Sequence, residues 1–384
     1  MNPKDFRALS AGKVIRAPQG YSAFIPAKLP PTLRYGDQFV LSLSRADAAL
    51  SELSGIGRHL PNSHLLIAPY VRREAILSSR IEGTKASLSD LFIDEMELPK
   101  QRTEVDDVRE VRNYVAAMEY GIERVRTLPL SLRLVREIHA RLMKGVRGDV
   151  ATPGEFRRSQ NWIGPSGSTI ETAPYVPPPL EHLDDLLADW EQFLHERNVL
   201  PDLVQCAIMH EQFEAIHPFL DGNGRVGRLL IPLFLIERGR LPQPLLYLSA
   251  YIEAHRQDYY DLLQRVRTHG DWMSWLRFFI AGVTTIALEA VGQAGRLMDL
   301  REKFRARLRD KAKALALLDE LFLNPYMSVA RAEQVLKVSN PTARQVVMLL
   351  NRLGMLEEIT GRTWGRLYLA KPIMETIELK GKSK

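Results

Sequence analysis

The sequence predicts a mainly α-helical protein with two short β-hairpins. Apolar residues recur at helical spacing through most of the 384 residues, and only two regions, 154–179 and 355–370, favour strands. The composition is 45% hydrophobic and 26% charged, which fits an ordinary globular chain and neither a disordered nor a membrane class. A chain of this length can bury a sizeable core and divide into two or three domains.

The remaining bulk properties restrict location more than function. The net charge of +6 permits nucleic acid or acidic partners without requiring them. The only cysteine, Cys206, cannot form a disulfide within the chain, so we expect a cytoplasmic protein in which Cys206 is a small buried hydrophobe. Residues 1–13 lack the apolar core of a signal peptide, and the apolar run at 229–236 is too short to span a membrane, so no membrane partner is expected.

Prolines and glycines set the expected boundaries near the N-terminus. Residues 1–37 contain several prolines and should be extended and irregular, because proline opposes a helix interior. A polar-faced helix over residues 38–54 should end near Gly55. Pro69 should then open a second helix, since proline suits the first helical turn, and Gly83 should end it.

The middle of the chain alternates helices with one extended region. Helices are predicted where apolar residues repeat at helical spacing, at residues 88–92, 105–125, 130–143, 180–195 and 202–216. The stretch 154–179 breaks this pattern around a Gly/Ser-rich turn, so we predict a β-hairpin there. Pro232 lies inside an apolar helical run, where proline costs about 3 kcal/mol, so we expect a kink or an early helix end.

The C-terminal part has a different pattern. A long, Arg-rich helix over residues 284–312 is expected to connect it to the rest. Three helices and two strands should follow, at residues 314–322, 328–336, 342–353, 355–359 and 366–370. This order resembles a winged helix-turn-helix, in which phosphates could be contacted by Arg344, Arg352, Arg362 and Arg366. A solvated basic face on a protein-docking module is an equal alternative.

The most distinctive stretch is residues 217–228, with the sequence His-Pro-Phe-Leu-Asp-Gly-Asn-Gly-Arg-Val-Gly-Arg. It lies between two predicted helices and should form a tight loop that leads into a helix N-terminus. Free backbone N–H groups and the helix dipole favour an anion at such a position. Gly222 and Gly224 allow positive φ and the close approach of a phosphate.

The side chains of this stretch add charge and a base. Arg225 and Arg228 carry guanidinium groups that suit phosphate oxygens. Asp221 can hold Mg²⁺, which usually takes one or two carboxylates together with substrate phosphates. His217 is placed to act as a general base. From these residues alone we predict metal-assisted chemistry on a phosphate-bearing ligand.

The stretch resembles the motif of the Fic family, HxFx(D/E)GNGRxxR, and matches it at every defined position. The resemblance implies transfer of AMP from ATP to a protein Ser, Thr or Tyr hydroxyl. In that family's pattern His217 takes the hydroxyl proton, Asp221 binds Mg²⁺ on the α- and β-phosphates, and Phe219 points into the core. The expected ATP site comprises Asp221, Gly222, Asn223, Gly224, Arg225, Val226, Gly227 and Arg228, with Arg228 on the γ-phosphate.

A second pattern, Ser78-x-x-x-Glu82-Gly83, resembles the inhibitory motif (S/T)xxxE(G/N) of the same family. Ser78 and Glu82 are four residues apart and therefore share one helix face. The resemblance implies that Glu82 pairs with Arg228 and blocks the γ-phosphate. The alternative is an ordinary glutamate at a solvated helix end.

Looser resemblances suggest a flap and an adenosine pocket. The predicted hairpin resembles the Fic flap, which clamps a target segment by strand addition. The corresponding flap residues are Ile163, Thr172, Ala173, Pro174 and Tyr175. The region that lines the adenosine pocket in relatives corresponds here to Tyr259, Tyr260 and Arg267. A plain surface hairpin and core tyrosines are the alternatives.

Together these patterns predict an auto-inhibited protein adenylyltransferase that uses Mg²⁺ and modifies unknown target proteins and itself. Four parts are expected: an N-terminal extension with the inhibitory helix, a Fic core, a helical connector and a winged helix, at residues 1–100, 101–283, 284–312 and 313–384. A homodimer, and DNA or protein as partner of the winged helix, stay open. One alternative function is a DNA-binding regulator whose core senses nucleotide, which the intact His217 argues against. The other is removal of AMP.

Overall fold

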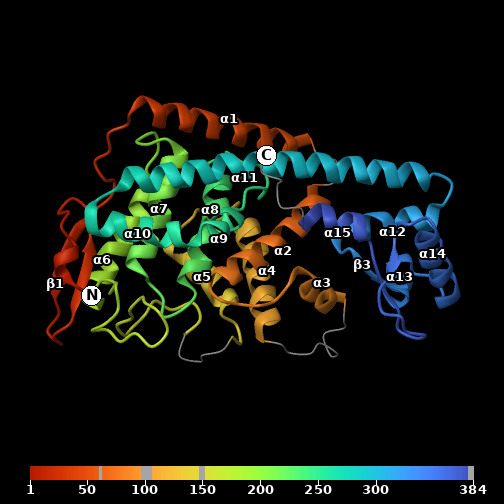
Figure 1. Ribbon diagram of the computed structural model, residues 1–384, viewed down its shortest axis with the longest axis horizontal. Coiled ribbons are helices and arrows are strands. Elements are labelled where there is room, and N and C mark those ends of the chain that lie inside the picture. The colour runs from red at the N-terminus through yellow and green to blue at the C-terminus, as the bar shows by residue number, and fades with distance from the viewer. Residues whose placement is uncertain (60–62, 97–105, 147–151, 379–384) are drawn as a thin grey trace.

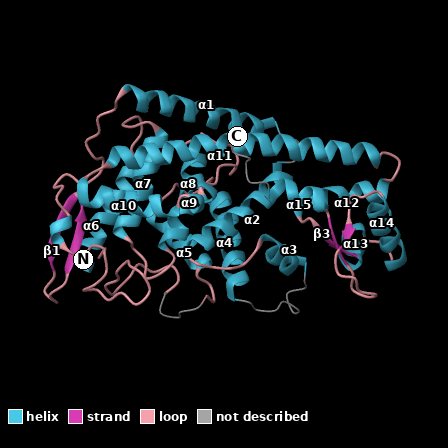
Figure 2. Cartoon of the chain, viewed as in Figure 1, coloured by secondary structure: helices cyan, strands magenta, loops and turns pink. Residues whose placement is uncertain are grey.

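The computed structural model describes residues 1–59, 63–96, 106–146 and 152–378, and these are mainly helical (Figure 1, Figure 2). The prediction of a mainly α fold is confirmed. The helices are α1 (Asp37–His59), α2 (Ser63–Ile81), α3 (Leu88–Met96), α4 (Asp106–Arg124), α5 (Leu132–Leu142), α6 (Leu183–His195), α7 (Asp202–Ile216), α8 (Asn223–Glu237), α9 (Ser249–Ala254), α10 (Arg256–His269), α11 (Trp272–Arg307), α12 (Ala312–Leu323), α13 (Val329–Leu336), α14 (Asn340–Arg352) and α15 (Lys371–Glu378), with short 3₁₀ turns at Pro3–Asp5 and Leu180–His182.

The antiparallel pair α7 and α8 forms the centre of the core. Both helices are buried on nearly every side, as expected of helices whose apolar residues are not confined to one face. The long helix α11 packs against α7 and α1, and α1 runs along its outer side (Figure 1). By length and composition alone α11 could cross a membrane, but half of its apolar stretch is buried inside the protein.

Several helix boundaries differ from the predictions. α1 continues through Gly55 to His59, and α2 contains Pro69 instead of beginning there. Gly57 permits close packing instead of ending α1, since a Cβ there would lie 3.1 Å from Leu245 Cδ1. α8 passes through Pro232 without ending, because its packing on almost every side outweighs the lost hydrogen bond.

The expected division into four parts stays a prediction. α11 continues without a break from the core across the expected connector border between residues 283 and 284. No helix end therefore marks the start of the expected connector at residue 284. The border between residues 100 and 101, and the start of the helix expected at 105, lie outside the described residues.

The N-terminal segment forms an unpredicted hairpin. Strands β1 (Gly12–Arg16) and β2 (Ser22–Pro26) pair antiparallel, with Val14 opposite Phe24. Two apolar runs around a Gly-containing turn were the available signal. The hairpin predicted at 154–179, by contrast, is reduced to one antiparallel bridge between Ile163 and Tyr175. This segment is rich in prolines, which lack the N–H donors that a longer ladder needs.

Residues 312–378, which we call the C-terminal unit, contain α12, α13, α14 and a three-stranded sheet. The strands are β3 (Tyr326–Ser328), β4 (Glu357–Glu358) and β5 (Leu367–Leu369), in the order β3-β5-β4. This order agrees with the winged helix-turn-helix that we predicted, although β3 and α15 were not foreseen. That identity stays a prediction.

The C-terminal unit is docked on the core. α12 and α15 pack against α2, and α15 also packs against α11. Gln293 of α11 donates to the Thr376 and Ile377 carbonyls at 2.7 and 2.8 Å, and Asn324 donates to the Phe92 carbonyl at 2.8 Å. The helix that carries Ser78, and that ends just before Glu82, therefore lies between the C-terminal unit and the rest of the core.

Candidate active site

The stretch at 217–228 forms the tight loop and helix start that its glycines predicted. His217 ends α7 in the left-handed region (φ 52°), and Gly222 (φ 79°) precedes α8. A Cβ on Gly222 would lie 2.9 Å from Met143 Sδ, so only glycine fits there. His217 takes a left-handed conformation without being glycine, at a cost of about 1–3 kcal/mol, and such strain is concentrated at functional sites.

The loop carbonyls are held from outside the loop. The donors are Arg157 Nε to His217 (3.0 Å), Arg157 N to Pro218 (2.8 Å), Asn161 Nδ2 to Phe219 (2.9 Å) and His139 Nε2 to Asp221 (3.1 Å). In a trans peptide the N–H points opposite to the carbonyl. These bonds fix the orientation of the loop peptides, and the N–H groups of Phe219 and Gly222 are taken by Asn223 Oδ1 and Asp221 Oδ1 within the loop. None of the three donor residues was among the site residues predicted from the sequence.

Asn223 closes the loop on itself. Its Oδ1 accepts the Phe219 N–H at 2.9 Å, and its Nδ2 donates to the Phe219 carbonyl at 2.8 Å. The Asn223 side chain is therefore fully used within the protein and can offer a phosphate only its backbone N–H. Phe219 is fully buried, as expected, and its ring stacks on His139 at a centroid distance of 3.7 Å.

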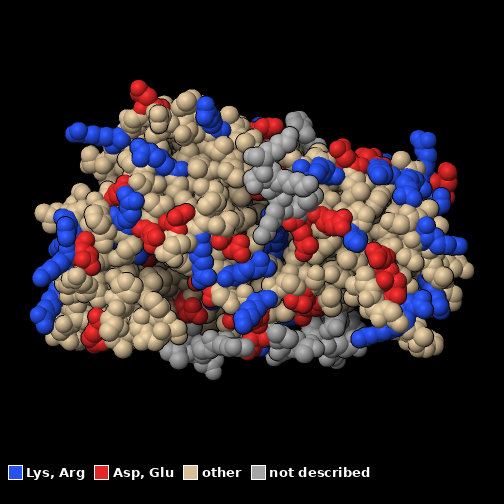
Figure 3. Space-filling model, viewed as in Figure 1, with Lys and Arg blue, Asp and Glu red and all other residues tan. Residues whose placement is uncertain are grey.

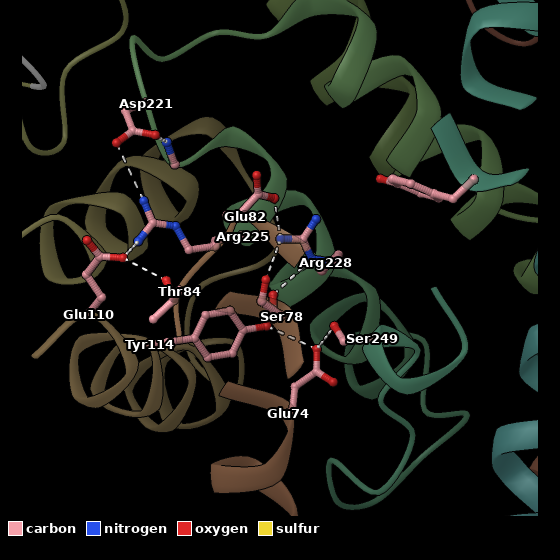
Figure 4. A network of polar contacts seen from close by, with 12 residues as sticks. Glu74, Ser78, Glu82, Thr84, Glu110, Tyr114, Asp221, Arg225, Arg228 and Ser249 are labelled. Carbon is pink, nitrogen blue, oxygen red and sulfur yellow. Dashed lines mark hydrogen bonds and ion pairs between the residues drawn. The ribbon is translucent and has the colours of Figure 1, made fainter. Parts of the chain in front are cut away.

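The two arginines are anchored by different helices (Figure 4). Arg228 donates from Nε to Ser78 Oγ at 2.9 Å and from Nη2 to Glu82 Oε1 at 2.6 Å. The pairing of Glu82 with Arg228 that the inhibitory pattern implied is thus present. Arg225 lies 3.4 Å from Glu110 of α4 and 3.6 Å from Asp221, in both cases measured from guanidinium nitrogen to carboxylate oxygen.

The Glu82 carboxylate lies against the first turn of α8. A Cβ built on Gly224 would collide with Glu82 Oε1 and would lie 2.9 Å from Arg228 Nη1. An anion therefore already lies at the helix N-terminus, where backbone N–H groups and the dipole favour negative charge. Burial alone would raise the pKa of Glu82, but the charge and hydrogen bond of Arg228 outweigh it and the pKa is lowered. Gly83, at φ 103°, follows as the predicted helix stop.

His217 is neutral at pH 7. Burial, with a smaller contribution from the charges of Arg267 and Arg157, lowers its pKa to about 3. A neutral imidazole has a ring nitrogen that can accept a proton. The charge state therefore permits the role of base that the sequence predicted.

Asp221 suits a hard cation. Its side chain is 57% exposed, and its Oδ1 accepts the Gly222 N–H at 2.6 Å. A single open carboxylate beside an anion position fits Mg²⁺, which takes few protein ligands when a nucleotide supplies phosphates. Within the described ranges no cluster of three or more His, Cys, Asp or Glu side chains could hold a metal without a nucleotide.

Val226 and Gly227 lie behind the loop and serve packing. Val226 is fully buried. A Cβ on Gly227 would lie 2.6 Å from Glu214 Oε1, so this glycine allows α7 and α8 to approach closely. The Val226 side chain does not reach the anion position, and Gly227 has no side chain.

Three buried carboxyl groups surround the site and were not foreseen. Burial raises the pKa values of Glu74, Glu211 and Glu214 to about 7. Glu74 Oε1 accepts the Tyr114 hydroxyl at 3.2 Å and the Ser249 hydroxyl at 2.5 Å. Polar residues at positions of α7 that face the core were the sequence signal for two of these groups.

The expected adenosine residues are mostly interior. Tyr259 is 1% exposed and its hydroxyl bonds His210 Nε2 at 2.9 Å. Arg267 pairs with Glu211 at 3.2 Å and is also buried. Tyr260 is 39% exposed and is the one of the three that is open to a ligand.

The expected flap residues alternate in exposure. Thr172 and Pro174 are exposed, whereas Ala173 and Tyr175 are buried. The Tyr175 hydroxyl donates to the Ala215 carbonyl at 2.7 Å and so ties this segment to α7. Ile163, partly buried, faces it through the single bridge. The alternation is that of an extended strand, even without a ladder.

The Glu82–Arg228 pair should give the folding stability a defined pH dependence. A folded-state pKa below the ordinary 4.5 stabilises the fold above that pH, and the contribution is lost as the pH falls through the lowered value. The unfolding free energy of the parent minus that of Glu82→Gln should therefore shrink on acidification below 4.5. Denaturant unfolding over this range measures it. Glu52→Gln, on the exposed face of α1, is the control. A difference that is independent of pH would contradict the pair's role.

Comparisons with known proteins cover the part of the chain that contains this site. The model described as Fic/DOC family N-terminal matches residues 40–123, and the model described as Fic/DOC family matches residues 129–235. Similar curated relatives include "Protein adenylyltransferase Fic" from Aedes aegypti, 32% identical over 214 residues, which are 54% of this chain and 39% of the relative. The relative of the same name from Drosophila willistoni is 30% identical over 256 residues, which are 64% and 47%. The chain spans less than half the length of these relatives.

Solved structures share the fold. A Fic family protein from Desulfovibrio desulfuricans has a TM-score of 0.55 at 22% identity and covers 92% of this chain and 99% of its own. Fic-1 from C. elegans has a TM-score of 0.50 at 21% identity and covers 68% of this chain and 73% of its own. At these identities the likeness concerns the fold alone. Residues 40–123 and 129–235 therefore match the two models of the Fic/DOC family, and the second stretch contains the motif residues assembled as described.

Proposed function

We propose that this chain is a protein adenylyltransferase that moves AMP from ATP to a Ser, Thr or Tyr hydroxyl of other proteins and of itself, and that Glu82 inhibits it. The observation that carries the proposal is the Glu82 carboxylate at the start of α8, 2.6 Å from Arg228 and close to His217. It lies where a terminal phosphate would bind. The named relatives support the same activity.

The reaction would be an in-line attack of the hydroxyl oxygen on the α-phosphorus. A new O–P bond forms, the bond to pyrophosphate breaks, and His217 takes the hydroxyl proton. A pKa of about 3 is low for a base. A bound triphosphate would place negative charge near the ring, and such a charge raises the pKa of a histidine.

The loop and Arg225 would bind the phosphates. The backbone N–H groups in the first turn of α8 and the Arg225 guanidinium would stabilise charge that develops on the phosphate oxygens. Mg²⁺, held by Asp221 together with the nucleotide, would neutralise part of the phosphate charge.

One experiment tests the activity. Purified protein is incubated in parallel with ATP labelled at the α-phosphate and at the γ-phosphate, in the presence of Mg²⁺. Label from the α position alone should appear on protein, and label from the γ position alone would instead indicate a kinase. His217→Ala should abolish incorporation and leave ATP binding largely intact, because His217 acts on the hydroxyl. Unchanged incorporation by this variant would contradict its role.

Glu82→Gly should activate the enzyme. A charge-assisted hydrogen bond contributes roughly 1.5–3 kcal/mol, and about 1.4 kcal/mol is a factor of ten. Initial rates of AMP incorporation should therefore rise by about 10- to 100-fold. Arg228→Ala and the double variant should both be poor, because Arg228 is also the phosphate ligand. Ser78→Ala is the matched control, since it removes an Arg228 partner and leaves Glu82 in place. A Glu82→Gly variant no faster than the parent rules out inhibition by Glu82.

We also infer a second function, binding of duplex DNA by the C-terminal unit. The C-terminal unit, residues 312–378, contains 8 lysines and arginines against 7 aspartates and glutamates, so the inference rests on where the positive charges lie and not on their sum. α14 holds no acidic residue, and its exposed side chains include Arg344, Gln345 and Arg352. Such side chains contact phosphates and base edges.

The position of this face supports the same inference. α14 lies at the end of the molecule away from α7 and α8 (Figure 1), and lysine and arginine side chains gather around this end (Figure 3). The neighbouring hairpin tip carries Trp364, 86% exposed, beside Arg362 and Arg366. An exposed aromatic and two arginines on a hairpin suit contact with a nucleic-acid backbone.

Fluorescence anisotropy with a labelled short duplex tests this. Affinity should fall steeply with salt, and Arg344→Ala and Arg352→Ala should each weaken binding and reduce the salt slope by about 1. Arg133→Ala, which removes an exposed arginine of α5, should leave binding unchanged. Binding that is independent of salt, or an equal loss in all three variants, would favour a protein-docking role instead.

A further inference from the structure

A buried histidine outside the motif contacts the loop at residues 217–222 beside Asp221. His139 lies in α5, is fully buried, and uses both ring nitrogens. Nδ1 accepts the Gly154 backbone N–H at 2.9 Å. Since an acceptor nitrogen carries no hydrogen, the ring proton is on Nε2, which donates to the Asp221 carbonyl at 3.1 Å.

The ring is fixed in this orientation by its surroundings. One face stacks on Phe219 with an interplanar angle of 6°, and Nε2 would lie 3.5 Å from a Cβ on Gly222. Burial lowers the pKa of His139 to about 4, so the ring is neutral at pH 7 and has a single N–H to donate. Stacking and the bond from Gly154 together leave that N–H directed at the Asp221 carbonyl.

The Asp221 peptide in turn orients the Asp221 carboxylate. The carbonyl of Asp221 and the N–H of Gly222 belong to one planar peptide and point in opposite directions. The Gly222 N–H donates to Asp221 Oδ1 at 2.6 Å. A bond from His139 to one side of this peptide therefore sets the direction of the carboxylate on the other side.

We propose that His139 is a positioning residue for the divalent cation, acting through the Asp221–Gly222 peptide. The inference rests on the proposed role of Asp221 as the cation's protein ligand. His139 touches neither cation nor substrate. Loss of the hydrogen bond lets the peptide rotate, and the carboxylate then no longer meets a nucleotide-bound cation in one fixed geometry.

Three substitutions separate this role from simple packing. His139→Gln places an amide N–H near the former Nε2 and keeps the donor to Asp221. His139→Asn reaches only the former Nδ1 position, so it can still accept from Gly154 but cannot reach the Asp221 carbonyl. His139→Phe keeps the stack on Phe219 and removes both hydrogen bonds. A packing role predicts that Phe is tolerated best, and a positioning role predicts that Gln is.

Binding of Mn²⁺ in place of Mg²⁺ provides the readout, measured by electron paramagnetic resonance with the full chain and ATP. Groups that hydrogen-bond a metal ligand typically contribute about 10- to 100-fold to the metal affinity. His139→Asn and His139→Phe should weaken Mn²⁺ binding by that factor. Their loss of Mn²⁺ affinity should be smaller than the loss in Asp221→Asn. His139→Gln should stay within a few-fold of the parent. ATP affinity in EDTA, without any cation, should be unchanged in each variant and shows that the pocket is intact.

The outcomes distinguish this inference from the proposed function. A parent that binds Mn²⁺ and ATP, together with Asn and Phe variants that bind Mn²⁺ equally well, overturns the role of His139 alone. A Gln variant as weak as the Phe variant, or variants that lose cation-free ATP affinity to the same extent, also overturns it, since the effect would then be structural. An Asp221→Asn variant with the parent's Mn²⁺ affinity overturns the cation role of Asp221 itself, and His139 falls with it.

Discussion

The buried guanidinium of Arg228 is the constraint on which the site depends. A charge at 2% side-chain exposure is costly without an anionic or polar partner, so Arg228 always needs one. Ser78 supplies two neutral acceptors, and Glu82 supplies the negative charge. In the proposed function, a nucleotide phosphate that reaches Arg228 would have to replace the Glu82 carboxylate, which lies over Gly224. Under this proposal, inhibition and phosphate binding would be two alternative ways of pairing the same buried cation.

The rest of the fold holds the two partners in place. α2 carries Glu74 and Ser78 on successive turns and ends just before Glu82, and α12 and α15 pack against the same helix. On the other side, residues far apart in the sequence fix the carbonyls of the catalytic loop, and Gly227 brings α7 and α8 together. The position of Glu82 therefore depends on helix packing. The proposed phosphate site depends instead on how the peptides of residues 217–222 are oriented.

The features that could be predicted from the sequence are those marked by a pattern of neighbouring residues. The loop at 217–222, the helix start at Gly222 and the pairing of Glu82 with Arg228 follow from glycines, spacing and motif residues within short stretches. Arg157, Asn161 and His139 were missed because each is a single residue that reaches across the fold, with no local pattern to mark it. Gly55 and Pro69 by themselves favour helix boundaries, but the packing of α1 and α2 as whole helices against their neighbours outweighs these preferences. Docking of α15 on α2 and α11 is likewise a contact between distant segments.

The most direct test of the account compares ATP with ADP, which lacks the terminal phosphate. Affinities are measured by calorimetry in a His217→Ala background, so that no AMP is transferred, with and without Glu82→Gly. If Glu82 occupies the place of the terminal phosphate, its removal should raise the affinity for ATP about tenfold or more and leave the affinity for ADP unchanged. Equal gains for both nucleotides, or no gain for ATP, would contradict the account.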